Sequence, residues 1–205
     1  MLVLGLTGSI GMGKSTVADM LRELGFPVFS SDAFIHKALD RDGKAVPTVA
    51  SLFPETYRDG AIDRVLLGAL VFSDPEKLQR LEGVLHPLVR KAETAFIQEA
   101  RKKNARAAVL EIPLLFETKA ETMCDFVLCV SAPLRIQRAR VLRRRNMTEK
   151  KLQAIRARQR PESEKKRRSD IIIPTGGSVA QTRHALFAKL ASLGLVDPRP
   201  TKRDL

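Results

Sequence analysis

The sequence lacks any apolar run that approaches the roughly 20 residues needed to cross a membrane. It also lacks the pattern of a signal peptide, because residues 2–16 already read as a buried strand followed by a glycine-rich loop. Its 205 residues, 44% of them hydrophobic, suffice for one domain with insertions. We therefore expect a cytoplasmic protein built around one globular core, with no membrane partner.

Cysteine is scarce: the chain has only Cys124 and Cys129. Both lie in or beside an apolar run, and their spacing forms no metal-binding or redox motif. We expect a buried pair of reduced thiols, as is typical of a reducing compartment.

Acidic residues are nearly absent from residues 135–168, which we call the basic region. It holds 15 Lys and Arg against three acids, and so carries 12 of the 13 net positive charges of the chain. Such a region suits a polyanionic ligand: a nucleotide, a phosphorylated cofactor or a nucleic acid. The alternative is a solvated basic helix that binds nothing. Aromatic residues are missing here too, which argues against a surface for stacking nucleic-acid bases.

Residues 8–16 carry the most specific motif of the chain, G-x-x-x-x-G-K-[ST]. Its fixed positions are held by Gly8, Gly13, Lys14 and Ser15. An apolar run over 2–6 precedes it, and residues 16–24 follow with apolar side chains at helical spacing. Strand, loop and helix in this order are the context of a phosphate-binding loop, or P-loop. An ordinary glycine-rich turn before a helix is the alternative.

The residue types of this motif suit a triphosphate. Glycines let backbone N–H groups approach the phosphate oxygens, and the helix N-terminus adds unpaired N–H groups. Lys14 would place a charge on the β- and γ-phosphates, and the Ser15 hydroxyl would bind Mg²⁺. The expected nucleotide-binding residues are Gly11, Met12, Gly13, Lys14, Ser15 and Thr16.

Asp32 follows the second expected strand, which ends at Ser30. In a doubly wound sheet, ligands bind beyond the carboxyl ends of the strands. A phosphoryl acceptor needs a carboxylate there to accept its proton, and such a carboxylate could also contact Mg²⁺ through water. The alternative, which does not exclude this role, is that Asp32 only caps a helix over 33–39.

The rest of the chain alternates between helical and strand patterns, which predicts an α/β fold with a five-stranded parallel sheet. Further strands are expected over 105–112, 125–130 and 170–173, with a loop over 54–60. Helices are expected over 46–53, 65–72, 75–84, 88–103, 133–145, 147–159, 161–168 and 178–193. We expect Ser73 or Asp74 to cap the helix at Pro75, His86-Pro87 to break it, and no strand within 60–103.

The sequence resembles the dephospho-CoA kinase family over about residues 1–190. Residues 6–17 are similar to the family's P-loop, which usually reads L-T-G-G-I-G-S-G-K-S-T-V. The family's H-P motif is matched at 86–90 and its P-L-L-F-E motif at 113–117. Its closing Q…E-K…D region is matched by Gln159, Glu164, Lys165 and Asp170.

This resemblance implies a P-loop kinase that transfers the γ-phosphoryl of ATP, with Mg²⁺, to the ribose 3′-hydroxyl of dephospho-CoA. It implies a nucleotide-binding core (1–59, 104–134 and 169–196), a helical acceptor-binding insertion (60–103), a basic lid (135–168) and a loose tail (197–205). For the protein itself we expect a monomer or a weak homo-oligomer.

Roles follow for single residues. Asp32 is the expected base, and Lys14 and Arg140 complete the catalytic set. Arg138 and Arg140 are the candidates for neutralising phosphate from the lid, with Arg143 and Arg144 as alternatives. The candidates for acceptor contacts are His86, Arg90, Leu115 and Glu117. Equally, His86 could buttress the helix break, Leu115 could pack under the site, and Glu117 could be solvated or salt-bridged.

Two stretches depart from the family pattern. The family usually carries D-A-D where this chain has Ser30-Ser31-Asp32, so only the second aspartate remains. Pro174-Thr175 replaces the usual asparagine turn near the adenine, which predicts backbone-only contacts to the base. Two other functions stay open: a P-loop kinase for another nucleoside or nucleotide, and a nucleic-acid-binding NTPase that uses the basic region. The helical insertion argues against the first, and the missing aromatics argue against the second.

Overall fold

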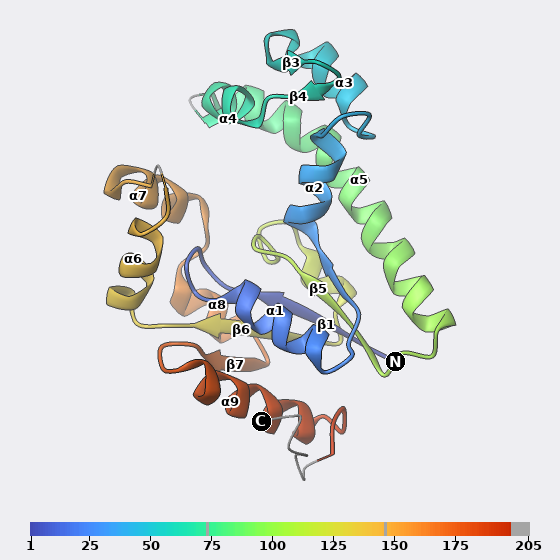
Figure 1. Ribbon diagram of the computed structural model, residues 1–205, viewed down its shortest axis with the longest axis vertical. Coiled ribbons are helices and arrows are strands. Elements are labelled where there is room, and N and C mark those ends of the chain that lie inside the picture. The colour runs from blue at the N-terminus through green and yellow to red at the C-terminus, as the bar shows by residue number, and fades with distance from the viewer. Residues whose placement is uncertain (73, 146, 198–205) are drawn as a thin grey trace. The chain divides into compact units, whose positions relative to one another are not determined.

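Strands and helices alternate along most of the chain in the computed structural model, which describes residues 1–72, 74–145 and 147–197 (Figure 1). The chain divides into two units. The first, which we call the sheet unit, comprises Met1–Phe29 and Glu99–Leu205. The second, which we call the helical unit, comprises Ser30–Gln98. The predicted insertion covered residues 60–103, whereas the helical unit covers residues 30–98. The role of the insertion in acceptor binding stays a prediction.

The five predicted strands are all present and form one sheet in the order β2-β5-β1-β6-β7. Strand β1 pairs in parallel with β5 and β6, and β6 pairs in parallel with β7. The strands are β1 (Leu2–Thr7), β2 (Val28–Ser30), β5 (Ala107–Glu111), β6 (Phe126–Ser131) and β7 (Ile171–Pro174). Strands β1, β5 and β6 are buried along almost their whole length, which explains why they read as continuous apolar runs.

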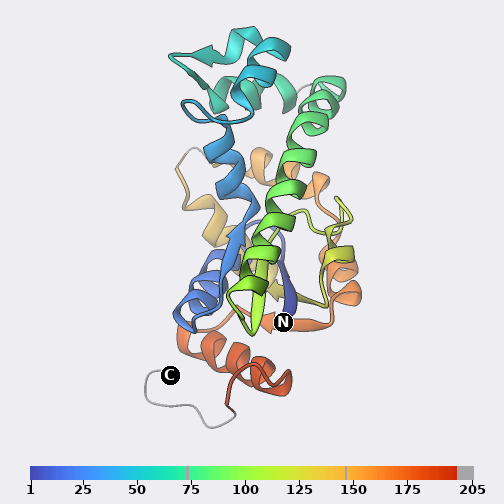
Figure 2. The same ribbon diagram turned by 90° about the vertical axis from the view of Figure 1, so that its right-hand side faces the viewer.

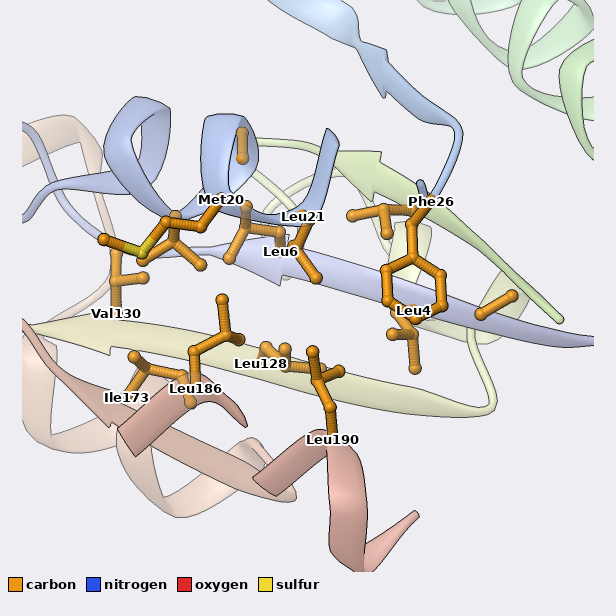
Figure 3. Close-up of a cluster of buried hydrophobic side chains, with 14 of the residues drawn as sticks. Leu4, Leu6, Met20, Leu21, Phe26, Leu128, Val130, Ile173, Leu186 and Leu190 are labelled. Carbon is orange, nitrogen blue, oxygen red and sulfur yellow. The ribbon is translucent and has the colours of Figure 1, made fainter. Parts of the chain in front are cut away.

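The core of the sheet unit lies between the sheet and two helices, α1 (Lys14–Glu23) and α9 (Val179–Ser192). Figure 3 shows side chains of both helices pointing toward strand residues such as Leu128. Burial of each leucine in this cluster stabilises the folded state by roughly 1.5–3 kcal/mol. The cluster therefore holds β1 against α1. Its labelled members are Leu4, Leu6, Met20, Leu21, Phe26, Leu128, Val130, Ile173, Leu186 and Leu190.

The basic region forms three helices of the sheet unit: α6 (Leu134–Leu142), α7 (Glu149–Arg158) and α8 (Glu162–Arg168). The Thr148 side chain accepts a hydrogen bond from Lys151 N and so caps α7. Helix α6 ends at Leu142 and not at Arg145 as predicted, so Arg143 and Arg144 lie beyond it. A short 3-10 helix, η2 (Ala120–Met123), precedes β6.

The helical unit contains a hairpin that was not predicted, formed by β3 (Tyr57–Arg58) and β4 (Ala61–Ile62). The predictions of a loop over 54–60 and of no strand within 60–103 are therefore wrong. Asp59 and Gly60 both have positive φ, the requirement of a tight two-residue hairpin turn. The Asp-Gly dipeptide is the sequence signal that could have predicted it. The unit's other elements are α2 (Ser31–Leu39), α3 (Val46–Leu52), η1 (Pro54–Thr56), α4 (Arg64–Phe72) and α5 (Pro75–Lys102).

Helix α5 runs without interruption through Pro87, so the predicted break at His86-Pro87 is wrong (Figure 2). An interior proline costs about 3 kcal/mol. Leucines on both sides of the proline pack into one cluster of the helical unit at helical spacing, and this burial outweighs the cost. These leucines are Leu78, Leu81, Leu85 and Leu88.

Asp74 caps α5, because its Oδ1 accepts hydrogen bonds from Glu76 N at 3.0 Å and Lys77 N at 3.2 Å. The other expected cap, Ser73, and most of the expected tail, 198–205, lie outside the described residues. In the part of the chain that the structure describes, no helix is long and apolar enough to span a bilayer.

Neither cysteine is in a disulfide, as expected. Cys129 is buried within β6, but Cys124 is only half-buried. The prediction of a buried pair is therefore wrong for Cys124, which lies just before the strand and not inside it.

Candidate functional site

The predicted P-loop connects β1 to α1, and its two ends are joined by a hydrogen bond from Lys14 to Gly8. Gly8 has φ 149°, and a Cβ there would lie 2.7 Å from the carbonyl oxygen of Val130, so only glycine fits. Gly13 has φ 87°, and a Cβ there would lie 3.3 Å from Thr175 Cβ. Lys14 Nζ donates a hydrogen bond to Gly8 O at 2.7 Å across the loop. The motif is thus the turn that the sequence predicted.

The start of α1 is suited to an anion. Lys14, Ser15 and Thr16 occupy its first turn, which carries no acidic residue. The side chains of Ser15 and Thr16 are exposed. Unpaired N–H groups and the helix dipole favour negative charge at such a terminus, and Lys14 adds a cation.

Three side chains of the basic region hold the other edge of the loop. Ile10 N donates to Gln159 Oε1 at 3.0 Å, and Ile10 O accepts from Gln137 Nε2 at 2.8 Å. Ser9 Oγ donates to Glu162 Oε2 at 3.1 Å. Gln137 and Glu162 carried no signal in the sequence, and Gln159 entered only through the family pattern.

A cavity of about 480 Å³ lies beside this edge. Its walls come from the P-loop, from α6, from α7 and from the segment that joins α7 to the start of α8. They include Ser9, Met12, Gln137, Gln159, Arg160 and Glu162. The basic region therefore encloses a space next to the P-loop within one unit of the chain.

Thr175 ties the end of β7 to the P-loop. Its side chain is 3% exposed, and its Oγ1 donates to Met12 O at 2.6 Å and lies 3.1 Å from Ser131 O. Because the Thr175 hydroxyl is hydrogen-bonded to the backbone of the P-loop, it supports the shape of the loop. The prediction of backbone-only contacts from this loop to a base stays a prediction.

The two candidate lid arginines differ in their surroundings. Arg138 is exposed, and its Nε lies 2.9 Å from Glu149 Oε2. Arg140 Nη2 donates to Thr175 O at 2.7 Å, whereas its Nη1 is buried and has no hydrogen-bond partner among the described residues. A buried guanidinium N–H without an acceptor is a place where an anion would be stabilised.

Glu117 forms a salt bridge, which was one of the roles expected for it beside an acceptor contact. Its Oε1 lies 3.1 Å from Lys165 Nζ and accepts a hydrogen bond from Arg160 N at 2.8 Å. Lys165 is fully buried and also donates to Pro113 O at 3.2 Å. Leu115 is fully buried, so its side chain packs inside the unit and does not reach the surface.

Asp32 lies in the first turn of α2, in the helical unit, with its side chain exposed. The cap of α2 is Ser30, whose Oγ accepts from Ala33 N at 3.5 Å. The alternative that Asp32 caps this helix is therefore wrong. Its role as a base stays a prediction.

Glu93 forms a buried polar cluster beneath this turn. It is 2% exposed, its Oε1 accepts a hydrogen bond from Ser31 Oγ at 3.0 Å, and its Oε2 lies 3.4 Å from Arg90 Nη1. Burial raises the pKa of the Glu93 carboxyl, and the hydrogen bond from Ser31 and the charges of Arg90 and His86 oppose that rise. Sequence reasoning singled out Arg90 and His86 but missed Glu93.

Comparisons with known proteins identify the family of the chain. The model of the dephospho-CoA kinase family matches residues 2–181. The chain is 55% identical to the dephospho-CoA kinase of Paramagnetospirillum magneticum over 81% of its length and 78% of the relative. It is 48% identical to that of Brucella melitensis over 94% of its length and 96% of the relative. The solved dephospho-CoA kinase of Campylobacter jejuni is 29% identical, with a TM-score of 0.69, over 95% of this chain and 98% of that one. The chain belongs to the dephospho-CoA kinase family.

Proposed function

We propose that the protein transfers the γ-phosphoryl group of ATP to the ribose 3′-hydroxyl of dephospho-CoA, giving coenzyme A and ADP as the last step of coenzyme A synthesis. The observation that carries this proposal is the closed P-loop at the start of α1, in a chain that belongs to this family. An acceptor of another class and a nucleic-acid-binding NTPase are not favoured, because the match to the family covers most of the chain.

The P-loop would hold the triphosphate of ATP. Backbone N–H groups from Gly11 to Thr16 would donate to its oxygens, and Lys14 would exchange the Gly8 carbonyl for the β- and γ-phosphates. Because Lys14 already lies across the loop, this exchange needs only a rotation of its side chain.

The residues present fit a magnesium ion that arrives with the nucleotide. The described residues contain no group of three or more His, Cys, Asp or Glu that could hold a metal by itself. Ser15 offers an exposed hydroxyl in the first turn of α1, and Mg²⁺ commonly binds few protein oxygens beside substrate phosphates. The ion would neutralise charge on the phosphates, with Ser15 and, through water, Asp32 as its protein contacts.

Asp32 would act on the acceptor. The 3′-hydroxyl oxygen attacks the γ-phosphorus, the bond to the leaving oxygen of ADP breaks, and the proton of the hydroxyl passes to the Asp32 carboxylate. Asp32 is exposed in the first turn of α2, so its carboxylate is open to an acceptor hydroxyl.

Arg140 is the better of the two candidates for stabilising the transferring group. Its Nη1 lacks an acceptor among the described residues, whereas Arg138 would first have to leave Glu149. Charge spreads over the phosphoryl oxygens in the transition state, so a buried cation there lowers the barrier.

In the helical unit, Arg90 and His86 lie one turn apart on α5 and would contact the phosphates of dephospho-CoA. We assign Leu115 to packing and Glu117 to holding Arg160 and Lys165, because their side chains are occupied in these ways.

The test is release of ADP from Mg·ATP in the presence of dephospho-CoA, compared with adenosine as acceptor. We expect turnover with dephospho-CoA only. Asp32→Asn should lower kcat about 10²- to 10⁴-fold and leave the Kd for ATP unchanged. Asp42→Asn, which changes an exposed aspartate in a loop of the same unit, is the matched control and should behave as the wild type.

Turnover of adenosine, or none with dephospho-CoA, would contradict the assigned acceptor. An Asp32→Asn variant as active as Asp42→Asn would remove Asp32 from the role of base.

A further inference from the structure

Three hydrogen bonds fasten the Ser9–Ile10 edge of the P-loop to side chains that come from more than 120 residues further along the chain. We call the three side chains, Gln137, Gln159 and Glu162, the P-loop clamp. Two clamp residues act on the same residue of the loop, because Gln159 accepts from Ile10 N while Gln137 donates to Ile10 O. Both backbone groups of Ile10 are thereby fixed in direction.

The clamp is itself held in place on its far side. Gln137 is 2% exposed, so its amide has little freedom to turn. Arg160, next to Gln159, donates its backbone N–H to Glu117, and the same Glu117 oxygen pairs with the buried Lys165. The segment from Gln159 to Lys165 therefore connects the loop after β5 to the Ser9–Ile10 edge of the P-loop.

A loop of this kind needs such support. Gly8, Gly11 and Gly13 all have positive φ, and glycines lose more conformational freedom on ordering than other residues. Within the loop, Met12 N donates to Ser9 O at 3.2 Å, and the clamp fixes the outer side of that turn. A loop that is ordered before the nucleotide arrives spends less of the binding energy on its own ordering.

We propose that Gln159, together with Gln137 and Glu162, is a positioning residue that holds the P-loop in its nucleotide-binding shape. The basic region then supports nucleotide affinity through these hydrogen bonds as well as through its positive charge. The inference rests on the proposed use of the loop for ATP. It assigns no direct contact with the nucleotide to Gln159.

The experiment measures ADP and ATP binding by calorimetry without acceptor, and steady-state kinetics with both substrates. Gln159→Ala should raise the Kd for ADP about fivefold to tenfold, the equivalent of one lost hydrogen bond. It should raise the KM for ATP by a similar factor and leave the KM for dephospho-CoA unchanged. The double variant Gln137→Ala/Gln159→Ala should depart from additivity, because both side chains hold the same residue.

Gln98→Ala is the matched control. Gln98 is an exposed glutamine of α5, and it does not line the cavity beside the P-loop. It should bind ADP as the wild type does.

An unchanged Kd for ADP in Gln159→Ala, or an equal change in Gln98→Ala, would overturn the inference. The inference would also be overturned if Gln159→Ala raised the KM values for both ATP and dephospho-CoA and lowered the melting temperature. That pattern would indicate a general structural role. Binding of ADP needs no acceptor, so a wild type that binds ADP but does not phosphorylate dephospho-CoA would refute the proposed function and leave the clamp standing. A wild type that binds neither nucleotide would overturn both.

Discussion

Ser31 donates a buried hydrogen bond to Glu93, with 3.0 Å between Ser31 Oγ and Glu93 Oε1. This contact joins the first turn of α2 to α5 inside the helical unit. The other oxygen of Glu93 faces Arg90, so one buried carboxylate orders both the turn that carries Asp32 and a guanidinium proposed to meet the acceptor. Removing the side chain of Ser31 or of Glu93 would take this hydrogen-bond partner from the other buried residue.

Glu93 should make stability depend on pH. Burial raises its pKa above the ordinary value of 4.5, so the folded state binds a proton more tightly than the unfolded state does. Its contribution to the unfolding free energy is fully present below pH 4.5 and is lost as pH rises through the raised folded pKa. We expect the stability of Glu93→Gln relative to the wild type to increase from about pH 4 to about pH 7.

Urea unfolding at several pH values measures this difference. The charged groups nearest to Glu93 are Arg90 and His86, and their charges oppose the rise of its pKa. A difference that does not change with pH would mean that Glu93 is not the titrating group.

Cys129 should be unreactive in the folded protein. Burial, and after it the charge of Glu162, raises the pKa of this thiol to about 11. At pH 8 only about one thousandth of it is thiolate, the reactive form. In a Cys124→Ser variant, we expect Ellman's reagent to modify Cys129 only after unfolding. The reverse variant, Cys129→Ser, keeps the half-buried Cys124 and should react faster in the native state. Rapid native labelling of Cys129 would show that β6 opens readily.

The salt bridge between the buried Lys165 and the partly buried Glu117 should be costly to break. Their charged atoms lie 3.1 Å apart, and Lys165 is fully buried. Lys165→Met leaves the Glu117 carboxylate without its cation and should lower the unfolding free energy by about 3–5 kcal/mol. Lys166→Met, at the exposed neighbouring position, should change it by less than about 0.5 kcal/mol. If Glu117→Gln/Lys165→Met is less stable than Lys165→Met alone, the loss is one of packing and not of an unpaired charge.

The sheet and the P-loop could be predicted from the sequence because both are local patterns. Strands buried on both faces read as short apolar runs, and the motif fixes its residues within eight consecutive positions. Helix ends were less certain, and the proline in α5 shows why. The local rule for Pro87 predicts a break, but the leucines around it are buried by partners that the local rule does not include.

The supports of the site could not be predicted in the same way. Gln159 meets Ile10 across 149 residues, Thr175 meets Met12 across 163, and Glu93 meets Ser31 across 62. No periodicity or spacing in the sequence records such a pairing. The residues proposed to carry the chemistry were named from local motifs, whereas the residues that support the P-loop and the first turn of α2 emerged only from the fold.

Thr175 provides the sharpest test of how the end of β7 supports the P-loop. Its hydroxyl donates to Met12 O, and valine would keep the shape of the side chain while removing that donor. We expect Thr175→Val to lower the unfolding free energy by about 1–3 kcal/mol and to weaken ADP binding several-fold, because the Met12 carbonyl sits within the loop that holds the phosphates. Thr182→Val is the matched control: Thr182 is also buried, but its hydroxyl bonds Pro174 O and Ser178 O, away from the loop. It should lose stability without losing ADP affinity. Equal ADP binding by both variants would mean that the loop keeps its shape without the Thr175 hydroxyl.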